Sequence, residues 1–177
     1  RQGNMENLYY TIIIFAIIIE YLLSGVGAFL DLRNITPEIP KDFQDAYDKD
    51  KYSKSQEYLK ARTKFSLFSS TFSLILMMVV IHTGIFGTLN EFVNAQTDHY
   101  ILQGLLFIAI IYFFQDIISL PFSIYSTFVI EERFGFNKTS TGLFISDKIK
   151  GYALFIVLGS IIILSLIHIS EPTRRYA

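Results

Sequence analysis

Four long runs of apolar residues dominate the hydrophobic pattern, and charged residues gather between the runs. A helix needs roughly 20 apolar residues to cross a bilayer. The runs predict membrane spans over about residues 8–30, 65–89, 100–130 and 152–167. A soluble domain of 177 residues could not bury helices that are apolar on every face. The pattern predicts an all-α fold, a polytopic transmembrane helical bundle with about four membrane helices.

The first run contains an acid, Glu20, near its middle. It also holds 13 Leu, Ile, Phe and Val residues. Each of these favours insertion by roughly 0.3 to 0.6 kcal/mol, which outweighs a central acid costing about 3 kcal/mol. The run lacks the basic start and the small-residue cleavage site of a signal peptide. We therefore expect it to insert as a span.

Basic residues in the connecting segments predict the orientation. Residues 31–64 carry eight Lys and Arg, residues 131–150 carry four, and residues 90–99 carry none. Because connections rich in Lys and Arg stay in the cytoplasm, the first and third loops should be cytoplasmic. The N-terminus and second loop should then be non-cytoplasmic. The host would be a bacterial inner membrane or an endoplasmic reticulum.

The loops show signs of ordered helical extensions. Pro37 and Pro40 should break the chain after the first span. Ser53 and Gln56 have capping-box spacing, so a helix should begin there and continue into the second span, with Gly84 and Gly87 at its far end.

The third run is too long for one simple crossing. As a continuous helix, residues 100–130 would measure about 46 Å, against a hydrocarbon core of about 30 Å. Pro121 should kink it, or its last turns should project into the cytoplasm. Gly135 and Asn137 tolerate a left-handed backbone and are typical of a helix end. Residues 146–150 then lead into the fourth span.

Composition narrows the class of protein further. Apolar residues make up 51% of the chain and the formal net charge is −1, which gives no indication of nucleic-acid binding. The sequence contains no cysteine, so disulfides and thiolate metal sites are excluded.

Two intramembrane acids, Glu20 and Asp116, are the residues most able to carry chemistry. Acids within spans are costly, and they usually pair or relay protons in a bundle interior. The structural alternative is a hydrogen bond across the bundle to Ser, Thr or Tyr, or a position of the acid nearer the membrane interface. The three histidines, His82, His99 and His168, have no spacing that sets two on one helix face, so no metal site is predicted.

Two cytoplasmic segments resemble one family. The first runs from Pro40-Lys-Asp-Phe43 through Tyr47 and Tyr52-Ser-Lys-Ser-Gln-Glu-Tyr58 to Thr63-Lys-Phe65. The second is Leu120-Pro-Phe-Ser-Ile-Tyr-Ser-Thr-Phe-Val-Ile-Glu-Glu-Arg-Phe-Gly-Phe-Asn137, with Asp147-Lys-Ile-Lys150 after it. Both resemble the N-terminal region of the type I CAAX prenyl proteases, which are multi-pass membrane zinc endopeptidases. The resemblance covers roughly residues 8–164.

The resemblance implies a role in which this chain supplies the membrane part. The family's zinc is held by an H-E-x-x-H helix and a distal glutamate, C-terminal to everything matched, and this sequence contains no H-E-x-x-H. The fragment should therefore hold no cofactor and be inactive, whereas the full-length protein would bind zinc. The expected partners are the lipid bilayer, the missing protease domain in cis and, in the full-length protein, a peptide substrate.

The resemblance also implies roles for the two cytoplasmic motifs. Its helices would line the family's intramembrane chamber, and its loops would lie against the protease domain. We expect Glu131, Glu132 and Arg133 to pair across that junction. The remaining motif residues should support the same region or the substrate chamber: Asn137, Ser55, Gln56 and Tyr58.

The ends of the sequence carry separate expectations. Residues 1–7 should be a disordered N-terminus, and residues 8–164 the membrane domain. Residues 165–177 can be written back as the end of a sequencing-library adapter, so we expect a non-native tail there. The rival function is a non-enzymatic bundle, a transporter or assembly subunit, that uses Glu20 and Asp116 as an ion path.

Overall fold

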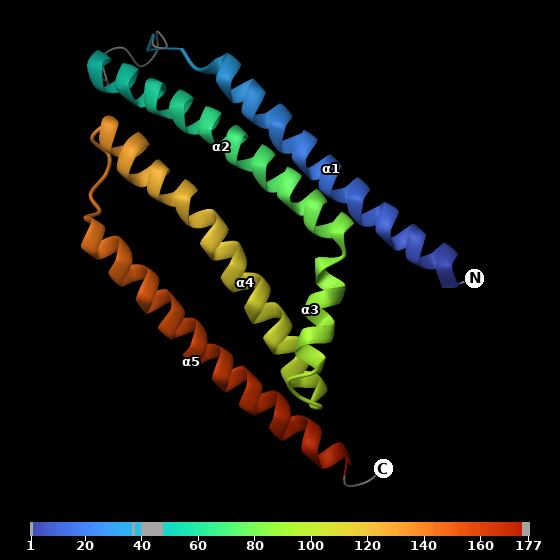
Figure 1. Ribbon diagram of the computed structural model, residues 1–177. Helices are drawn as coiled ribbons and strands as arrows, with labels where there is room; N and C mark the ends of the chain where they lie inside the picture. The colour runs from blue at the N-terminus through green and yellow to red at the C-terminus, as the bar shows by residue number, and fades with distance from the viewer. Residues whose placement is uncertain (1, 37, 40–47, 175–177) are drawn as a thin grey trace. The chain divides into compact units, whose positions relative to one another are not determined.

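The computed structural model describes residues 2–36, 38–39 and 48–174, and these residues form helices joined by short connections (Figure 1). The expected breaks at Pro37 and Pro40 fall outside these ranges. The helices are α1 (Gln2–Asn34), α2 (Lys49–Thr83), α3 (Ile85–Asn94), α4 (Tyr100–Tyr125), the π-helical turn η2 (Ser126–Glu131) and α5 (Thr141–Arg174). α1 begins at Gln2, although we had expected residues 1–7 to be disordered.

The helices confirm the expected all-α membrane architecture. Four candidate spans are long and apolar enough to cross a membrane: Leu8–Asn34, Lys49–Thr83, Tyr100–Glu131 and Thr141–Ser165. Among the described residues, the buried apolar side chains are only Ile39, Val93, Ile130 and Phe134. The many other apolar side chains stay exposed, which is stable only where lipid surrounds them.

The chain divides into two compact units. The first comprises residues 1–83 and 122–137, and the second residues 84–121 and 138–177. In the first unit α1 and α2 lie side by side (Figure 1). A hydrogen bond of 2.7 Å between the hydroxyls of Tyr21 and Thr71 joins them.

α2 begins earlier than the capping pattern predicted. The Asp48 carboxylate accepts hydrogen bonds from the backbone N–H groups of Asp50 and Lys51, at 2.9 and 3.2 Å. An acid at this position satisfies free donors of the first turn, so Asp48 caps the helix. The predicted start at Ser53 and Gln56 was wrong, because both residues lie inside α2.

α2 ends at Thr83, next to Gly84, one of the two glycines expected at its far end. Gly84 has φ of 71°, a left-handed conformation that interrupts the helix and that a residue with a side chain adopts at a cost. Gly84 therefore marks the far end of α2 as predicted, whereas Gly87 lies inside the next helix and the span stops short of residue 89. Residues 85–94 form the separate short helix α3, where a loop was expected from residue 90.

The end of the third span contains a π-helical turn. Pro121 lies inside α4, and η2 continues the helix to Glu131. Gly135, with φ of 71°, ends it as predicted, and the Glu131 carbonyl accepts hydrogen bonds from Phe136 and Asn137 N–H at 2.9 and 3.2 Å. Asn137 does not take the left-handed conformation that the sequence suggested.

In the second unit, α5 begins at Thr141, well before the predicted start of the fourth span at residue 152. The Ser140 side chain accepts a hydrogen bond from Leu143 N–H at 3.2 Å and caps the helix. Residues 146–150, expected to lead into the span, are therefore already helical. The rings of Tyr112 on α4 and Phe155 on α5 stack at 4.8 Å.

Candidate functional site

The two sequence motifs meet at one end of the first unit, where α2 emerges from its apolar part. Tyr58 of the first motif contacts two aromatic residues of the second. Its ring lies 5.7 Å from that of Phe134 in an edge-on arrangement and 4.7 Å from that of Phe136. Phe134 is buried. Aromatic pairs in such geometries stabilise by about 0.5–1.5 kcal/mol beyond area burial.

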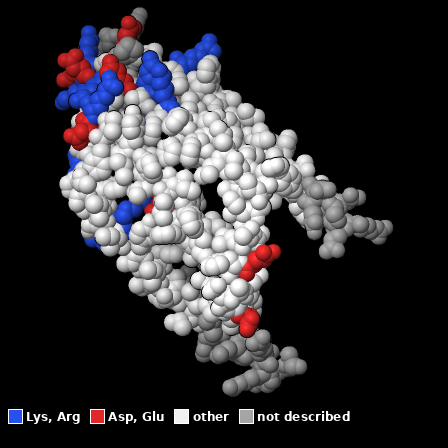
Figure 2. All heavy atoms as spheres, in the orientation of Figure 1, with Lys and Arg blue, Asp and Glu red and all other residues white. Residues whose placement is uncertain are grey.

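Charged residues mark the same end of the unit. Figure 2 shows Lys, Arg, Asp and Glu gathered where α2 begins. Glu132 accepts a 2.8 Å hydrogen bond from the side-chain amide of Asn137, so these two motif residues hold the turn after η2. Glu131 is half-buried. Arg133 forms no ion pair with another residue that the structure describes, and its guanidinium lies 5.6 Å from the Phe134 ring.

Two further motif residues, Ser55 and Gln56, remain outside this contact. Ser55 is exposed and Gln56 is half-buried on α2. Neither side chain hydrogen-bonds to another residue within the described ranges. Their expected support of the site stays a prediction.

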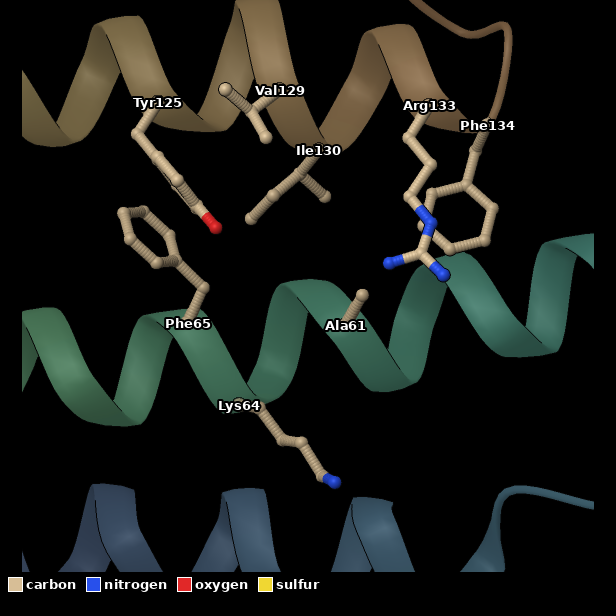
Figure 3. Close-up of a pocket in the computed structure, with 8 residues that line it drawn as sticks. All are labelled: Ala61, Lys64, Phe65, Tyr125, Val129, Ile130, Arg133 and Phe134. Carbon is tan, nitrogen blue, oxygen red and sulfur yellow. The ribbon is translucent and has the colours of Figure 1, made fainter.

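A cavity of about 280 Å³ lies between α2 and the η2 segment (Figure 3). α2 contributes Ala61, Lys64 and Phe65 to its walls. The facing segment contributes Tyr125, Val129, Ile130, Arg133 and Phe134. The rings of Phe65 and Tyr125 stack at 4.9 Å. The Arg133 side chain extends toward α2, whereas that of Lys64 points away from the cavity (Figure 3).

Glu20 lies at a second cavity, between α1 and α2 of the same unit. Its walls include Tyr21 and three serines, Ser24, Ser70 and Ser73. The expected cross-helix hydrogen bond exists here, but Tyr21 forms it with Thr71, and Glu20 stays exposed beside it.

Asp116 in the second unit has two donors from α5. The ammonium of Lys148 lies 2.5 Å from one carboxylate oxygen, and the Tyr152 hydroxyl donates to the other. The side chain of Asp116 is 17% exposed. The sequence singled out Asp116 but missed Lys148, which it placed in a loop. The i, i+4 spacing of Lys148 and Tyr152 could have shown that both lie on one helix face.

No cluster of three potential metal ligands occurs among the residues that the structure describes. At the motif end, the described residues make aromatic contacts and hydrogen bonds, and no nucleophile among them contacts a base. The described contacts at this end are those of a junction between packed helices.

The fold defines the class as a multi-pass membrane protein, and comparison with known families specifies which one. The family model described as "CAAX prenyl protease N-terminal, five membrane helices" matches residues 29–177. The chain belongs to the CAAX prenyl protease family, of which it forms the N-terminal membrane domain.

Individual relatives belong to the same family. The chain is 32% identical over 159 residues to a CAAX prenyl protease 1 homolog of Arabidopsis thaliana, covering 84% of this chain and 38% of that protein. It is 32% identical over 132 residues to CAAX prenyl protease 1 of Saccharomyces cerevisiae, covering 69% of this chain and 29% of the relative. The crystal structure of S. mikatae Ste24p matches with a TM-score of 0.78 and 27% identity, over 92% of this chain and 40% of that one.

Proposed function

We propose that this chain is the membrane portion of a zinc metalloendopeptidase that acts on prenylated peptides. The family membership supports this activity for a longer protein, since the chain spans 38% of the Arabidopsis relative's length. In that protein zinc would activate the water that attacks the peptide bond. The portion described here would supply helices around the substrate and a docking end for the protease domain.

The observation that carries the proposal is the contact of the two motifs through Tyr58, Phe134 and Phe136. Residues of the two family-like motifs, nearly 80 positions apart in the sequence, pack together at one end of the first unit. This end carries Glu131 and Glu132, which we propose face the protease domain. We propose the same for Arg133, whose side chain within this chain extends toward α2 (Figure 3).

The orientation is part of the proposal. The packed end lies at the loops that are rich in Lys and Arg, and such loops stay in the cytoplasm. The rival function, an ion path through Glu20 and Asp116, has weaker support. The Asp116 carboxylate already accepts from Lys148 and Tyr152, so it is not free to relay an ion.

A chimera tests the proposed function. The chain replaces the matched N-terminal region of the S. cerevisiae relative, and cleavage of a prenylated peptide is measured in membranes. We expect zinc-dependent cleavage that a chelator abolishes. The matched control is a chimera that carries the corresponding region of the Arabidopsis homolog. The Arabidopsis and S. cerevisiae relatives are each 32% identical to this chain.

The proposal is contradicted if the Arabidopsis chimera cleaves while this chimera inserts at equal level, keeps its helical content and remains inert.

A further inference from the structure

The cavity between α2 and η2 lies at the boundary between lipid and water. In α2 the charged residues end at Lys64, and residues 65–81 contain none. In the third span the apolar run ends at Ile130, and charge begins at Glu131. Because spans change from apolar to charged at the headgroup level, both transitions mark the same surface of the membrane. Residues from both sides of this boundary line the cavity.

The walls of the cavity are apolar at one end and cationic at the other. Phe65, Val129 and Ile130 supply the apolar part, and Arg133 supplies a charge that reaches into it (Figure 3). No acid is among its lining residues. Within the described ranges, the Arg133 guanidinium has an aromatic neighbour, Phe134, but no carboxylate partner. The nearest acid in sequence, Glu132, is engaged by Asn137.

We propose that this cavity binds one anionic phospholipid, with its net-negative headgroup on Arg133 and an acyl chain along Phe65 and Val129. A guanidinium presents paired donors that match phosphate oxygens, and basic pockets between spans bind anionic headgroups on the cytoplasmic side. Lys64 lines the cavity but points away, so it adds to the positive field rather than to the hydrogen bonds. This inference does not rest on the proposed protease activity.

The test measures lipid retention by the whole 177-residue chain. The protein is purified in detergent, stripped of lipid and incubated with phosphatidylserine or phosphatidylcholine of the same acyl composition. Native mass spectrometry then counts the bound lipid. We expect one phosphatidylserine to be retained in preference to phosphatidylcholine. Arg133→Gln should reduce its retention about tenfold, a loss equivalent to about 1.4 kcal/mol, because the charge-assisted hydrogen bonds to the headgroup are removed.

Two further variants separate binding from folding. Lys138→Gln removes an exposed cation of the following connection that does not line the cavity, and should leave retention unchanged. Ala61→Leu fills the cavity without changing charge and should reduce retention of phosphatidylserine as Arg133→Gln does. Circular dichroism verifies equal helical content in every variant.

The inference is overturned if Arg133→Gln retains phosphatidylserine as the unsubstituted chain does, or if both lipids bind equally. The first result would also be expected if the cavity instead receives a peptide segment of the longer protein.

Discussion

Asp116 shows how the second unit accommodates an acid within a span. A charged side chain at the bilayer centre costs about 2.5–3.5 kcal/mol on insertion scales. Here Lys148 and Tyr152 from α5 satisfy both oxygens of the carboxylate. The carboxylate therefore serves to fasten α4 to α5 inside this unit.

Removing only one residue of the Asp116–Lys148 pair should destabilise the protein more than removing both. Lys148→Met leaves Asp116 without its cation, so we expect a loss of stability of roughly 2–3 kcal/mol. Asp116→Leu combined with Lys148→Met should recover most of it, because no charge remains in the span. Thermal unfolding followed by circular dichroism in detergent measures both.

Lys150→Met is the matched control. Lys150 lies two residues away and forms an exposed pair with Asp147 at 3.6 Å. Exposed pairs contribute about 0–1 kcal/mol, so little change is expected. Equal losses for Lys148→Met and Lys150→Met would contradict a fastening role for Asp116.

Tyr58 joins the two motifs near the turn after η2, while Phe65 joins them further along α2 by stacking on Tyr125. Tyr58→Ala removes contacts to Phe134 and Phe136, and we expect it to lower stability by about 1–3 kcal/mol. It should also expose the connection after η2 to limited proteolysis. Tyr52→Ala is the control, because the Tyr52 ring contacts no other ring in the part that the structure describes. A proteolysis pattern identical in both variants would contradict the joining role.

At the scale of elements, one backbone conformation separates α2 from α3. Gly84 takes φ of 71° and has open space around it. The obstacle to a side chain there is the left-handed backbone and not crowding.

Gly84→Ala should destabilise the protein by about 1–2 kcal/mol, or fuse α2 and α3 into one helix with higher helical content. Gly87→Ala should instead be neutral or stabilise by up to about 1 kcal/mol, because Gly87 is helical and its Cβ would meet nothing within 4 Å. Circular dichroism and thermal unfolding distinguish the two. Equal effects at both glycines would be inconsistent with a break at Gly84.

The apolar runs predicted the spans because lipid tolerates no unpaired backbone, so long apolar segments have only one available conformation. The residues at which the helices begin and end were harder to predict from the sequence. Asp48 and Ser140 set two boundaries that the hydrophobic pattern does not reveal, because each acts through one capping side chain. Gly84 was expected at the far end of α2, and its φ of 71° ends the helix there. Because the fourth span was expected to start at residue 152, Lys148 was assigned to a loop and its pairing with Asp116 was missed.

At the candidate site, the motifs indicated residues but could not indicate the contacts between them. It indicated Tyr58, Glu132 and Asn137 through the motifs, and the structure shows that Tyr58 packs on the second motif and that Glu132 accepts from Asn137. The cavity beside Arg133 depends on how η2 faces α2. Spacing along one chain cannot specify that arrangement.

For the whole molecule, the distribution of Lys and Arg makes a prediction about sidedness. Because the chain contains no cysteine, a single introduced cysteine reports one position. In sealed vesicles with the cytoplasmic face inside, Asn90→Cys should react with a membrane-impermeant maleimide. Ser55→Cys and Lys138→Cys should react only after permeabilisation.

All three positions have exposed side chains, so access to the reagent differs only by compartment. Labelling of Ser55→Cys and Lys138→Cys from opposite faces would contradict the predicted topology and would remove the lipid site from its place at the membrane surface.

The 35 residues of α2 form a continuous rod of about 52 Å, some 20 Å longer than the hydrocarbon core it crosses. A helix without an interruption transmits a tilt from one end to the other. If the embedded part leans by about 10°, the tip beyond the headgroups sweeps sideways by several ångströms. The position of any domain bound to that tip therefore depends on the tilt of α2, and so on the thickness and lateral pressure of the surrounding bilayer.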